Sequence, residues 1–592
     1  MNQNKTKKKR YLVDNLFARM FFIMLIGMLS TMLCNIIDSI VTGQFLGSDA
    51  VAAMALVSPI IALISLTASL FTSGTSQLCM RSMGKADIRK VNQVFSTMAV
   101  CNVVLCLSLS TLLFIFSPAL IGFLSKGANE NAVQMAVDYL RGYAFFLPSA
   151  GLATLLNGLM VLDNDQKRSV GFAMLMLVLD VVFDLINVLV IHQGMFGMAL
   201  ASTLSCAISL VWLLMHFCKE GHLLHFTPDN LNFGDVKEVL TYGLAGAIPM
   251  LMNSIRSYSY NFSLIRAGGT EAVAAFSVAN SAFILIIALI STIQSTTGTL
   301  SGYAYGEEDI NGLERVIKSA LSLSYRTYLA FGLVLFVFAY PVSGFFINPQ
   351  AIELRQTAAS FMRFLATQYA LGIASYVLTG SFTGTGHVKL NYMISVLRDG
   401  LYPCLSVIAL GAVFGLSGIR SGFILSGMLT LATCYLIPFL MNHRGIKSVR
   451  DILILPESFY LKPSEYLEAS ASTLEQVLEM SRAAYDFCIK RGENAKTAGM
   501  VSLFVEEMGA NTVQYGFESV KHGLIELRIV LKEDKRLIRL KDNGRTFDPV
   551  KWLKDNHPED PTKNIGIRLT VGLAKNIQYI PAMKFNNMMI FL

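Results

Sequence analysis

Long apolar runs separated by short polar loops occupy about the first three quarters of the chain. A helix needs roughly 20 mostly apolar residues to cross a bilayer, so each run predicts one transmembrane helix. Proline and glycine inside the runs are compatible with helices, because neighbouring helices satisfy the freed backbone groups. Twelve runs qualify, over residues 16–41, 51–78, 92–117, 136–162, 169–191, 195–218, 238–263, 272–304, 313–346, 357–384, 391–413 and 418–441.

After residue 442 charges become frequent, and the pattern changes to short alternating strands and amphipathic helices. The predicted fold class is an all-α polytopic membrane protein, with twelve helices in two lobes, followed by a C-terminal α/β-sandwich domain. The predicted parts are a basic N-terminus (1–15), an N-lobe of six helices (16–218), an inter-lobe linker (219–237), a C-lobe of six helices (238–442), a second linker (443–457) and a tail (458–592).

The composition supports a membrane protein. Hydrophobic residues make up 53% of the 592 residues and charged residues 15%, whereas soluble domains carry about 25% charged residues. The net charge of +8 does not indicate nucleic-acid binding, because most basic residues flank apolar runs. The nine cysteines form no CxxC pair, so neither a disulfide framework nor a cysteine metal site is expected.

Lysine and arginine alternate between the two sides of the predicted helices. The rule that positive loops stay inside places the basic side, both termini and the tail in the cytoplasm, in a multi-pass cell-membrane protein. The basic side collects Lys5, Lys7, Lys8, Lys9, Arg10, Arg81, Lys85, Arg89, Lys90, Lys167, Arg168, Arg315, Lys318, Arg444, Lys447 and Arg450.

The membrane part repeats itself after about 222 residues. Residues 47–53 (GSDAVAA) recur at 269–275 as GTEAVAA, and residues 84–88 (GKADI) recur at 306–310 as GEEDI. Six helices separate the copies, so both insert in the same direction and are parallel repeats. Such a duplication places a cavity between two lobes, a geometry that suits alternating access.

Three acids lie inside the predicted helices of the N-lobe. An ionisable group there costs about 2.5–3.5 kcal/mol to insert, so each is a candidate functional residue. Asp180 and Asp184 are four residues apart on one helical face, Asp38 lies in the first helix, and Ser202 lies in the sixth. A shift of 222 moves Asp38 onto Tyr260, so the duplication did not retain the acids. Clustered acids repel, and the group can hold either a proton or Na⁺. The alternative without a functional role is that each acid lies near a helix end and is solvated at the membrane surface.

The C-lobe carries other charges. Arg256 lies in the seventh predicted helix, and Arg398 and Asp399 are adjacent near the start of the eleventh. An interfacial position or an internal ion pair explains these residues at least as well as contact with a substrate.

Residues 34–47 (CNIIDSIVTGQFLG) resemble the first-helix pattern of multidrug and toxic compound extrusion (MATE) transporters. Asp184, thirteen residues before the stretch 197–202 (GMALAS), and the repeat at 269–275 strengthen this resemblance, which covers residues 11–445. It implies a cation-coupled antiporter that exports amphiphilic, often cationic, compounds. It also implies that Asp38 and Asp184 bind H⁺ or Na⁺. Asp180 stands where that branch often has Asn, which leaves the coupling ion open, and Ser202 stands where Thr is common.

The tail reads as a mixed α/β domain. A short strand, a loop and an amphipathic helix are expected within 458–492, followed by a second helix around 503–516 (LFVEEMGANTVQYG). Strands are expected at 525–531, 537–541 and 587–592, with turns at 542–544 and 547–549 and a further helix from residue 564.

This order resembles the histidine-kinase-like ATPase fold, especially anti-sigma-factor serine kinases. The resemblance implies that Asn511 ligates Mg²⁺ on the phosphates of ATP and that Glu507 polarises the attacking group. It implies that Asp542 accepts a hydrogen bond from the adenine amino group, that Gly544 allows close approach, and that Gly566 lets a helix N-terminus face phosphate. Asn564 stands where Gly is usual, which puts turnover in doubt.

Several functions remain open at this stage. No GxxxxGK[ST] loop occurs, so an ATP-driven pump of the ABC type is disfavoured, and no His lies between 444 and 521 to act as a phosphoacceptor. The first reading is an ion-coupled exporter whose tail binds ATP, hydrolyses it or phosphorylates a cytoplasmic regulatory protein. The second is a transporter-derived sensor that controls the tail, and the third is a plain transporter with an inert tail.

Overall fold

The computed structural model describes most of the chain, in short and long stretches. The described residues are 12–124, 129–160, 162–163, 165–218, 221–348, 350–442, 448–456, 459, 462, 464–518, 520, 522–532, 536–556, 567–568, 571–572, 576–582 and 585–591. The basic N-terminus (1–11) and Gly566 lie outside them.

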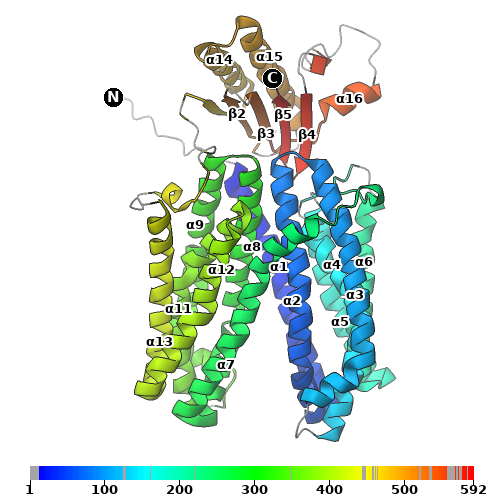
Figure 1. Ribbon diagram of the computed structural model, residues 1–592, viewed down its shortest axis with the longest axis vertical. Coiled ribbons are helices and arrows are strands. Elements are labelled where there is room, and N and C mark those ends of the chain that lie inside the picture. The colour runs from blue at the N-terminus through cyan, green and yellow to red at the C-terminus, as the bar shows by residue number, and fades with distance from the viewer. Residues whose placement is uncertain are drawn as a thin grey trace. The chain divides into compact units, whose positions relative to one another are not determined.

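The chain divides into two compact units, one of membrane helices and one containing the tail (Figure 1). The helical unit comprises Phe17–Val161 and Asp165–Ile454, and the other comprises Leu455–Leu592 with two short segments. The N-lobe contains α1 (Leu12–Val41), α2 (Ser48–Gly84), α3 (Ile88–Leu124), α4 (Glu130–Met160), α5 (Gln166–Ile186) and α6 (Gly194–Leu214). The C-lobe contains α7 (Asp235–Ala282), α8 (Ile284–Gly306), α9 (Ile310–Val337), α10 (Ala339–Ser343), α11 (Ile352–Thr385), α12 (Val388–Ser395) and α13 (Tyr402–Asn442).

Nine helical segments among the described residues are long and apolar enough to cross a membrane. One of them, Val388–Met441, is 54 residues long and bends at Gly415, so it spans two of the predicted runs. The predicted fold class is confirmed, whereas the count of twelve crossings stays a prediction. Large apolar side chains lie exposed along these helices, including Leu63, Phe123 and Val190, as expected of surfaces that face lipid.

The internal repeat is visible in the backbone of both lobes. Left-handed φ angles recur in pairs about 222 residues apart: Gly47 (85°) with Gly269 (65°), Ala86 (62°) with Glu308 (54°), and Gly194 (59°) with Gly415 (59°). Two of these pairs are glycines, because a residue without Cβ adopts positive φ at little cost. The duplicated sequence therefore folds into duplicated bends, which break the chain into equivalent helices in each lobe.

The two lobes pack against each other at the end of the bundle that carries basic loops. A Cβ atom added to Gly74 on α2 would lie 2.0 Å from the backbone oxygen of Val239 on α7. A Cβ on Gly84 would lie 2.2 Å from the backbone oxygen of Tyr303 on α8. Arg81 on α2 also donates a hydrogen bond to the hydroxyl of Tyr242 on α7. Absent side chains thus allow backbone-to-backbone contact between the lobes, as in close helix packing in membranes.

The tail is built on a five-stranded antiparallel sheet with strand order β1-β2-β3-β5-β4. Its elements are β1 (Tyr466–Ala471), α14 (Leu474–Lys490), α15 (Ala495–Asn511), β2 (Ile525–Leu531), β3 (Arg536–Asp542), α16 (Pro549–Asn556), β4 (Asn576–Ala582) and β5 (Phe585–Phe591). The register pairs Leu527 with Leu540, and Leu540 with Met588. These side chains therefore share one face of the sheet.

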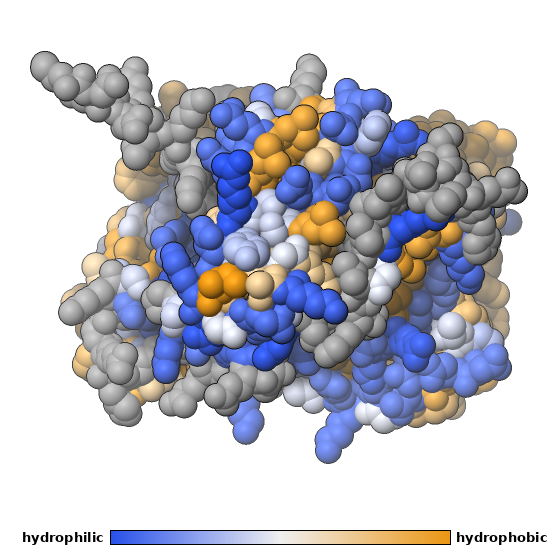
Figure 2. Space-filling view, turned by 90° about the horizontal axis from the view of Figure 1, so that it is seen from above, coloured by the Kyte–Doolittle hydropathy of each residue, from blue (hydrophilic) through white to orange (hydrophobic). Residues whose placement is uncertain are grey.

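Two helices cover that face. Val477 and Met480 of α14 and Phe504 and Met508 of α15 are buried in one cluster with Ile529 and the other inward-pointing strand residues. The face of the tail seen in Figure 2 is mostly hydrophilic with small separate hydrophobic patches, as expected of a domain in water.

Two elements of the tail differ from the sequence expectation. The predicted turn at 547–549 leads directly into α16, where Asp548 Oδ1 accepts hydrogen bonds from the backbone N–H groups of Val550 and Lys551. Strand β4, which contains Pro581, was not among the strands expected from the sequence. β4 lies at the sheet edge next to β5, and edge strands are where proline is tolerated in a sheet.

The close contacts of Gly74 predict how the methyl group of an alanine at this position changes the packing between the lobes. We expect Gly74→Ala to disfavour the closed contact by about 1–3 kcal/mol, because its Cβ overlaps the backbone of Val239. Double electron–electron resonance between nitroxide labels at the exposed positions Arg89 and Lys237 should then report longer distances between the labels than in the wild type. Gly27→Ala is the control, since nothing lies within 4 Å of that position. An unchanged distance distribution in Gly74→Ala would show that this contact does not hold the lobes together.

Candidate functional site

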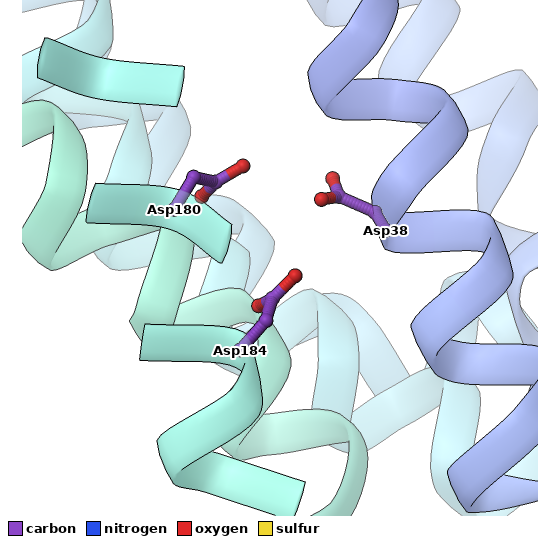
Figure 3. A group of neighbouring side chains, drawn as sticks. All are labelled: Asp38, Asp180 and Asp184. Atoms are coloured by element: carbon purple, nitrogen blue, oxygen red, sulfur yellow. The ribbon is translucent and has the colours of Figure 1, made fainter. Parts of the chain in front are cut away.

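Three carboxylates of the N-lobe meet between α1 and α5. One oxygen each of Asp38, Asp180 and Asp184 lies within 4.8 Å of the others (Figure 3). Asp38 projects from α1, and Asp180 and Asp184 project toward it from successive turns of α5. The i, i+4 spacing places the two α5 acids on one face, as the sequence indicated.

The three carboxylates are unequally satisfied. Asp180 is 2% exposed and accepts a hydrogen bond from the Ser205 hydroxyl at 3.0 Å. Asp184 is fully buried, and neither of its oxygens has a hydrogen-bond partner among the described residues. Asp38 Oδ1 is likewise buried without a partner in that part of the chain. Buried carboxylate oxygens without donors are costly, so this cluster is suited to receiving a cation or protons.

Serines on α6 flank the Asp180 end of the cluster. Ser202, expected from the sequence, contacts Asp180 through its side chain, and Ser205 does so as well. Ser205 was missed because serine is common in helices and its spacing of 25 residues from Asp180 carries no local signal. It lies three residues, about one helical turn, after Ser202, so the two hydroxyls face the same neighbour.

A π-helical turn and a glycine hold the end of α5. The turn η2 (Asn187–Ile191) follows α5, and Asn187 Nδ2 donates to the backbone oxygen of Gly194 at 3.0 Å. A Cβ on Gly197 would lie 1.9 Å from Asn187 Oδ1, so only glycine fits beside this amide. Asn187, which the sequence analysis did not single out, therefore fixes α6 against the helix that carries Asp180 and Asp184.

The cluster is chemically competent for a small cation. Carboxylate and hydroxyl oxygens are the ligands that hard cations prefer, and three adjacent acids repel each other unless a proton or cation neutralises them. The residues present therefore fit either H⁺ or Na⁺, and geometry does not separate the two.

The C-lobe charges are arranged differently. Arg398 and Asp399, 5% and 4% exposed, form a two-pronged ion pair with Nη2–Oδ2 at 2.6 Å and Nε–Oδ1 at 2.9 Å. Of the three explanations left open by the sequence, the internal ion pair applies to Arg398 and Asp399. Arg256 instead lines a cavity in the same lobe.

In the tail, Asp542 ends β3 and is only 6% exposed. Its Oδ1 accepts hydrogen bonds from Gly544 N at 2.8 Å and Asn586 Nδ2 at 2.7 Å. A Cβ on Gly544 would lie 3.0 Å from both Asp542 Oδ1 and the backbone oxygen of Gly516, so the loop has no room for a larger residue.

Two residues that the sequence analysis missed hold this loop in place. Asn586 on β5 also donates to the backbone oxygens of Gly544 and Arg545, and Tyr579 on β4 donates to Asn586 Oδ1 at 2.7 Å. An asparagine in a strand pattern gives no signal of this role, because the pairing of β3 with β5 alone brings it to Asp542.

The other predicted residues of the tail lie on α15. Glu507 and Asn511 are half-buried, one turn apart near the helix end. The next turn, η8 (Thr512–Gly516), contacts the Asp542 loop through a hydrogen bond from Arg545 N to Gly516 O at 2.9 Å. The structure thus brings the Asn511 end of α15 beside Asp542 and Gly544, while Gly566 lies outside the described residues.

Two family models match this chain. A model described as MatE matches residues 24–186 and 247–408, together more than half of the chain. The two matched segments begin 223 residues apart, close to the internal repeat. A model described as Histidine kinase-like ATPase domain matches residues 470–586, which include all of the expected nucleotide-binding residues.

Two curated relatives are similar to this chain over about two thirds of its length. The probable multidrug resistance protein YoeA of Bacillus subtilis (strain 168) is 22% identical over 378 residues, 61% of this chain and 79% of the relative. The multidrug export protein MepA of Staphylococcus haemolyticus (strain JCSC1435) is 20% identical over 405 residues, 67% and 86% respectively.

Solved structures share the fold. An outward-facing multidrug resistance MATE family transporter of the MOP superfamily matches with a TM-score of 0.65 and 24% identity, over 71% of this chain and 94% of that chain. A MOP superfamily transporter from Pyrococcus furiosus, described with a binding pocket of reverse polarity, matches with a TM-score of 0.64, 23% identity and the same coverage.

The environment of Asp542 predicts a pH dependence of stability. Burial raises the pKa of its carboxyl from an ordinary value near 3.8 to about 6, although the Asn586 and Gly544 hydrogen bonds oppose the shift. The folded tail then binds this proton more tightly than the unfolded tail, so stability falls as the pH rises from about 4 to about 6. Relative to Asp542→Asn, the loss is at most about 3 kcal/mol.

The measurement is denaturant unfolding of the full chain in a Trp212→Phe background. The chain contains two tryptophans, so the fluorescence of Trp552 then reports the tail alone. A difference between wild type and Asp542→Asn that stays constant from pH 4 to pH 7.5 would contradict the assignment.

Proposed function

This chain belongs to the MatE family, and we propose that it is a cation-coupled antiporter with an ATP-binding regulatory tail. It exports amphiphilic compounds, cationic ones included, in exchange for H⁺ or Na⁺. The relatives described as multidrug resistance and multidrug export proteins support drug-like substrates. The observation that carries the proposal is the cluster of Asp38, Asp180 and Asp184, the one such group of acids among the residues that the structure describes.

The coupling ion acts by neutralising the cluster. Asp38 belongs to α1, whereas the other two acids belong to α5, so a bound ion draws these helices together. Without an ion, repulsion among the carboxylates pushes the helices apart. Asp180 keeps its hydroxyl partner on α6 and anchors the site, while Asp184 and Asp38 supply the free oxygens that take up and release the cation.

Motion of the lobes carries the substrate across. In the present conformation the lobes meet at the basic end through Gly74, Gly84 and the Arg81–Tyr242 contact. When this contact is released, the space between the two lobes opens toward the predicted cytoplasmic side. When the contact forms, that space opens toward the opposite side. Parallel repeats that rock against each other support such alternating access.

The tail binds ATP with Mg²⁺ and regulates rather than powers transport. Asp542 receives the adenine amino group, Gly544 allows the base to approach, and Asn511 holds Mg²⁺ on the phosphates. Glu507 polarises the attacking group in hydrolysis or phosphoryl transfer, and Gly566 faces phosphate. The match to the histidine kinase-like ATPase model and the packing of η8 against the Asp542 loop support this arrangement.

Neutralising one acid tests the coupling. We expect Asp184→Asn to lower gradient-driven substrate exchange in vesicles by at least about tenfold, because an ion site loses a charged ligand. The assay compares imposed pH and Na⁺ gradients, and the gradient that drives wild-type exchange identifies the ion. Asp138→Asn on α4 is the control, since Asp138 lies in the same lobe outside the cluster.

The same assay separates the transporter from the sensor reading. Flux that survives removal of 458–592 supports transport as the primary activity. Flux that is absent from every variant, together with nucleotide turnover that responds to ligand, would favour a sensor. Wild-type exchange in a double Asp38→Asn, Asp184→Asn variant would sink the coupling proposal.

Nucleotide binding tests the tail. We expect Asp542→Asn to weaken binding of a fluorescent ATP analogue to the full chain by about tenfold or more, since a charged acceptor is lost. Wild-type affinity should also fall below about pH 6, where protonation of Asp542 removes the acceptor. Equal affinity of the two proteins at pH 7.5 would exclude Asp542 from the site.

Glu507→Gln should retain binding but lose phosphate release or transfer, because only the polarising group is removed. Glu506→Gln is the matched control, an exposed neighbour on the same helix. Turnover that falls equally in both variants would contradict the role of Glu507.

A further inference from the structure

The C-lobe contains a partly open cavity of about 270 Å³, far in the sequence from the carboxylate cluster. It is lined by residues of α7, α8 and α11 and by the π-helical turn η5 (Val396–Leu401). Ligand pockets commonly begin near this size, with mostly apolar walls and a few polar groups. Its charged residues are Arg256, Arg398 and Asp399.

Two of the three charges cancel. The Arg398–Asp399 ion pair is closed by two short contacts, and Arg398 also donates to the Thr379 hydroxyl at 3.2 Å. The Arg398 guanidinium lies over the Tyr376 ring, 3.7 Å from its centroid. Arg398 and Asp399 are adjacent in the chain and both line the cavity. Adjacent residues of an α-helix point about 100° apart, and the π-helical turn at this position departs from that geometry. This pair contributes shape and hydrogen-bonding groups but no net charge.

The third charge remains unbalanced. Arg256 on α7 is half-buried and donates a hydrogen bond to Asn253, and it forms no ion pair within the described part of the chain. Four aromatic side chains line the same cavity, namely Tyr260, Phe276, Tyr369 and Tyr376. A guanidinium in such surroundings has a strong preference for a carboxylate or similar planar anion, which it can bind with two parallel hydrogen bonds.

We infer that this cavity is a binding site for small amphiphilic organic anions, with Arg256 holding the carboxylate and the tyrosines packing against the apolar body. The site deepens the proposed function and rests on it for the release of the ligand across the membrane. Its polarity is opposite to that of the N-lobe cluster, which holds three acids. The two lobes thus separate the coupling cation from an anionic substrate, so the two do not compete for the same groups.

The test measures binding of three probes of matched shape to the purified full chain in nanodiscs. Radiolabelled 2-naphthoate, neutral 2-naphthamide and cationic 2-naphthylmethylammonium differ chiefly in charge. We expect naphthoate to bind at least about tenfold more tightly than the other two, and Arg256→Gln to abolish that preference. Arg256→Lys should retain part of it, because charge remains while the fork of donors is lost.

Arg266→Gln is the matched control, an exposed arginine on the same helix that does not line the cavity. Equal binding of the three probes, preference for the cation, or unchanged preference in Arg256→Gln would overturn the inference. Asp38→Asn with Asp184→Asn should leave naphthoate binding intact while exchange is lost. Failure of the proposed coupling therefore shows in flux, and failure of this site shows in binding.

Discussion

Charges that leave water need a counter-charge or a ligand, and the helical unit of this protein is organised around that requirement. The bilayer offers no solvent to a carboxylate or guanidinium, so an ion pair or a bound ligand of opposite charge stabilises such a group inside the helices. Arg398 and Asp399 take the first course with a closed ion pair. Asp38, Asp184 and Arg256 form no ion pair within the described residues, and the ligands proposed for them would supply the missing counter-charge.

The duplicated scaffold makes this division possible. Both lobes repeat the same bends, at Gly47 and Gly269 and at Gly194 and Gly415. Within this common frame the N-lobe concentrates negative charge and the C-lobe carries a net positive cavity. Because the backbone bends supply the architecture, the polar side chains of each lobe were free to diverge. The MatE family fold thus holds groups of opposite charge in its two lobes, three acids in the N-lobe and Arg256 in the C-lobe cavity.

π-helical turns and glycines shape the N-lobe acid cluster, the C-lobe cavity and the contact between the lobes. The π-helical turns η2 and η5 stand next to the N-lobe acids and within the C-lobe cavity, and such turns accompany functional positions in many helices. Asn187 leaves no room for a side chain at Gly197. A side chain at Gly74 would likewise overlap the backbone of the other lobe. In the tail, Asn586 and Tyr579 similarly hold the loop that presents Asp542.

The sequence by itself determined the features that depend on local periodicity and composition. Apolar run lengths, the period of 222 residues and the spacing of Asp180 from Asp184 can be read along the chain, and the fold class inferred from the runs and the repeat was confirmed. The MATE resemblance, carried by short motifs such as residues 34–47, was confirmed as well. Strands β2, β3 and β5 were found for the same reason, since their alternation is local.

Tertiary structure alone decided the contacts between distant segments. The meeting of Asp38 with α5, the Ser205 contact, the pairing of Asn586 with Asp542 and the place of Arg256 in the C-lobe cavity depend on helix and strand packing. Edge strand β4 was hidden because its proline reads as a strand breaker until its place at the sheet edge is known. Packing joins residues without regard to their separation in sequence, and for that reason the chemistry of each site emerged only in three dimensions.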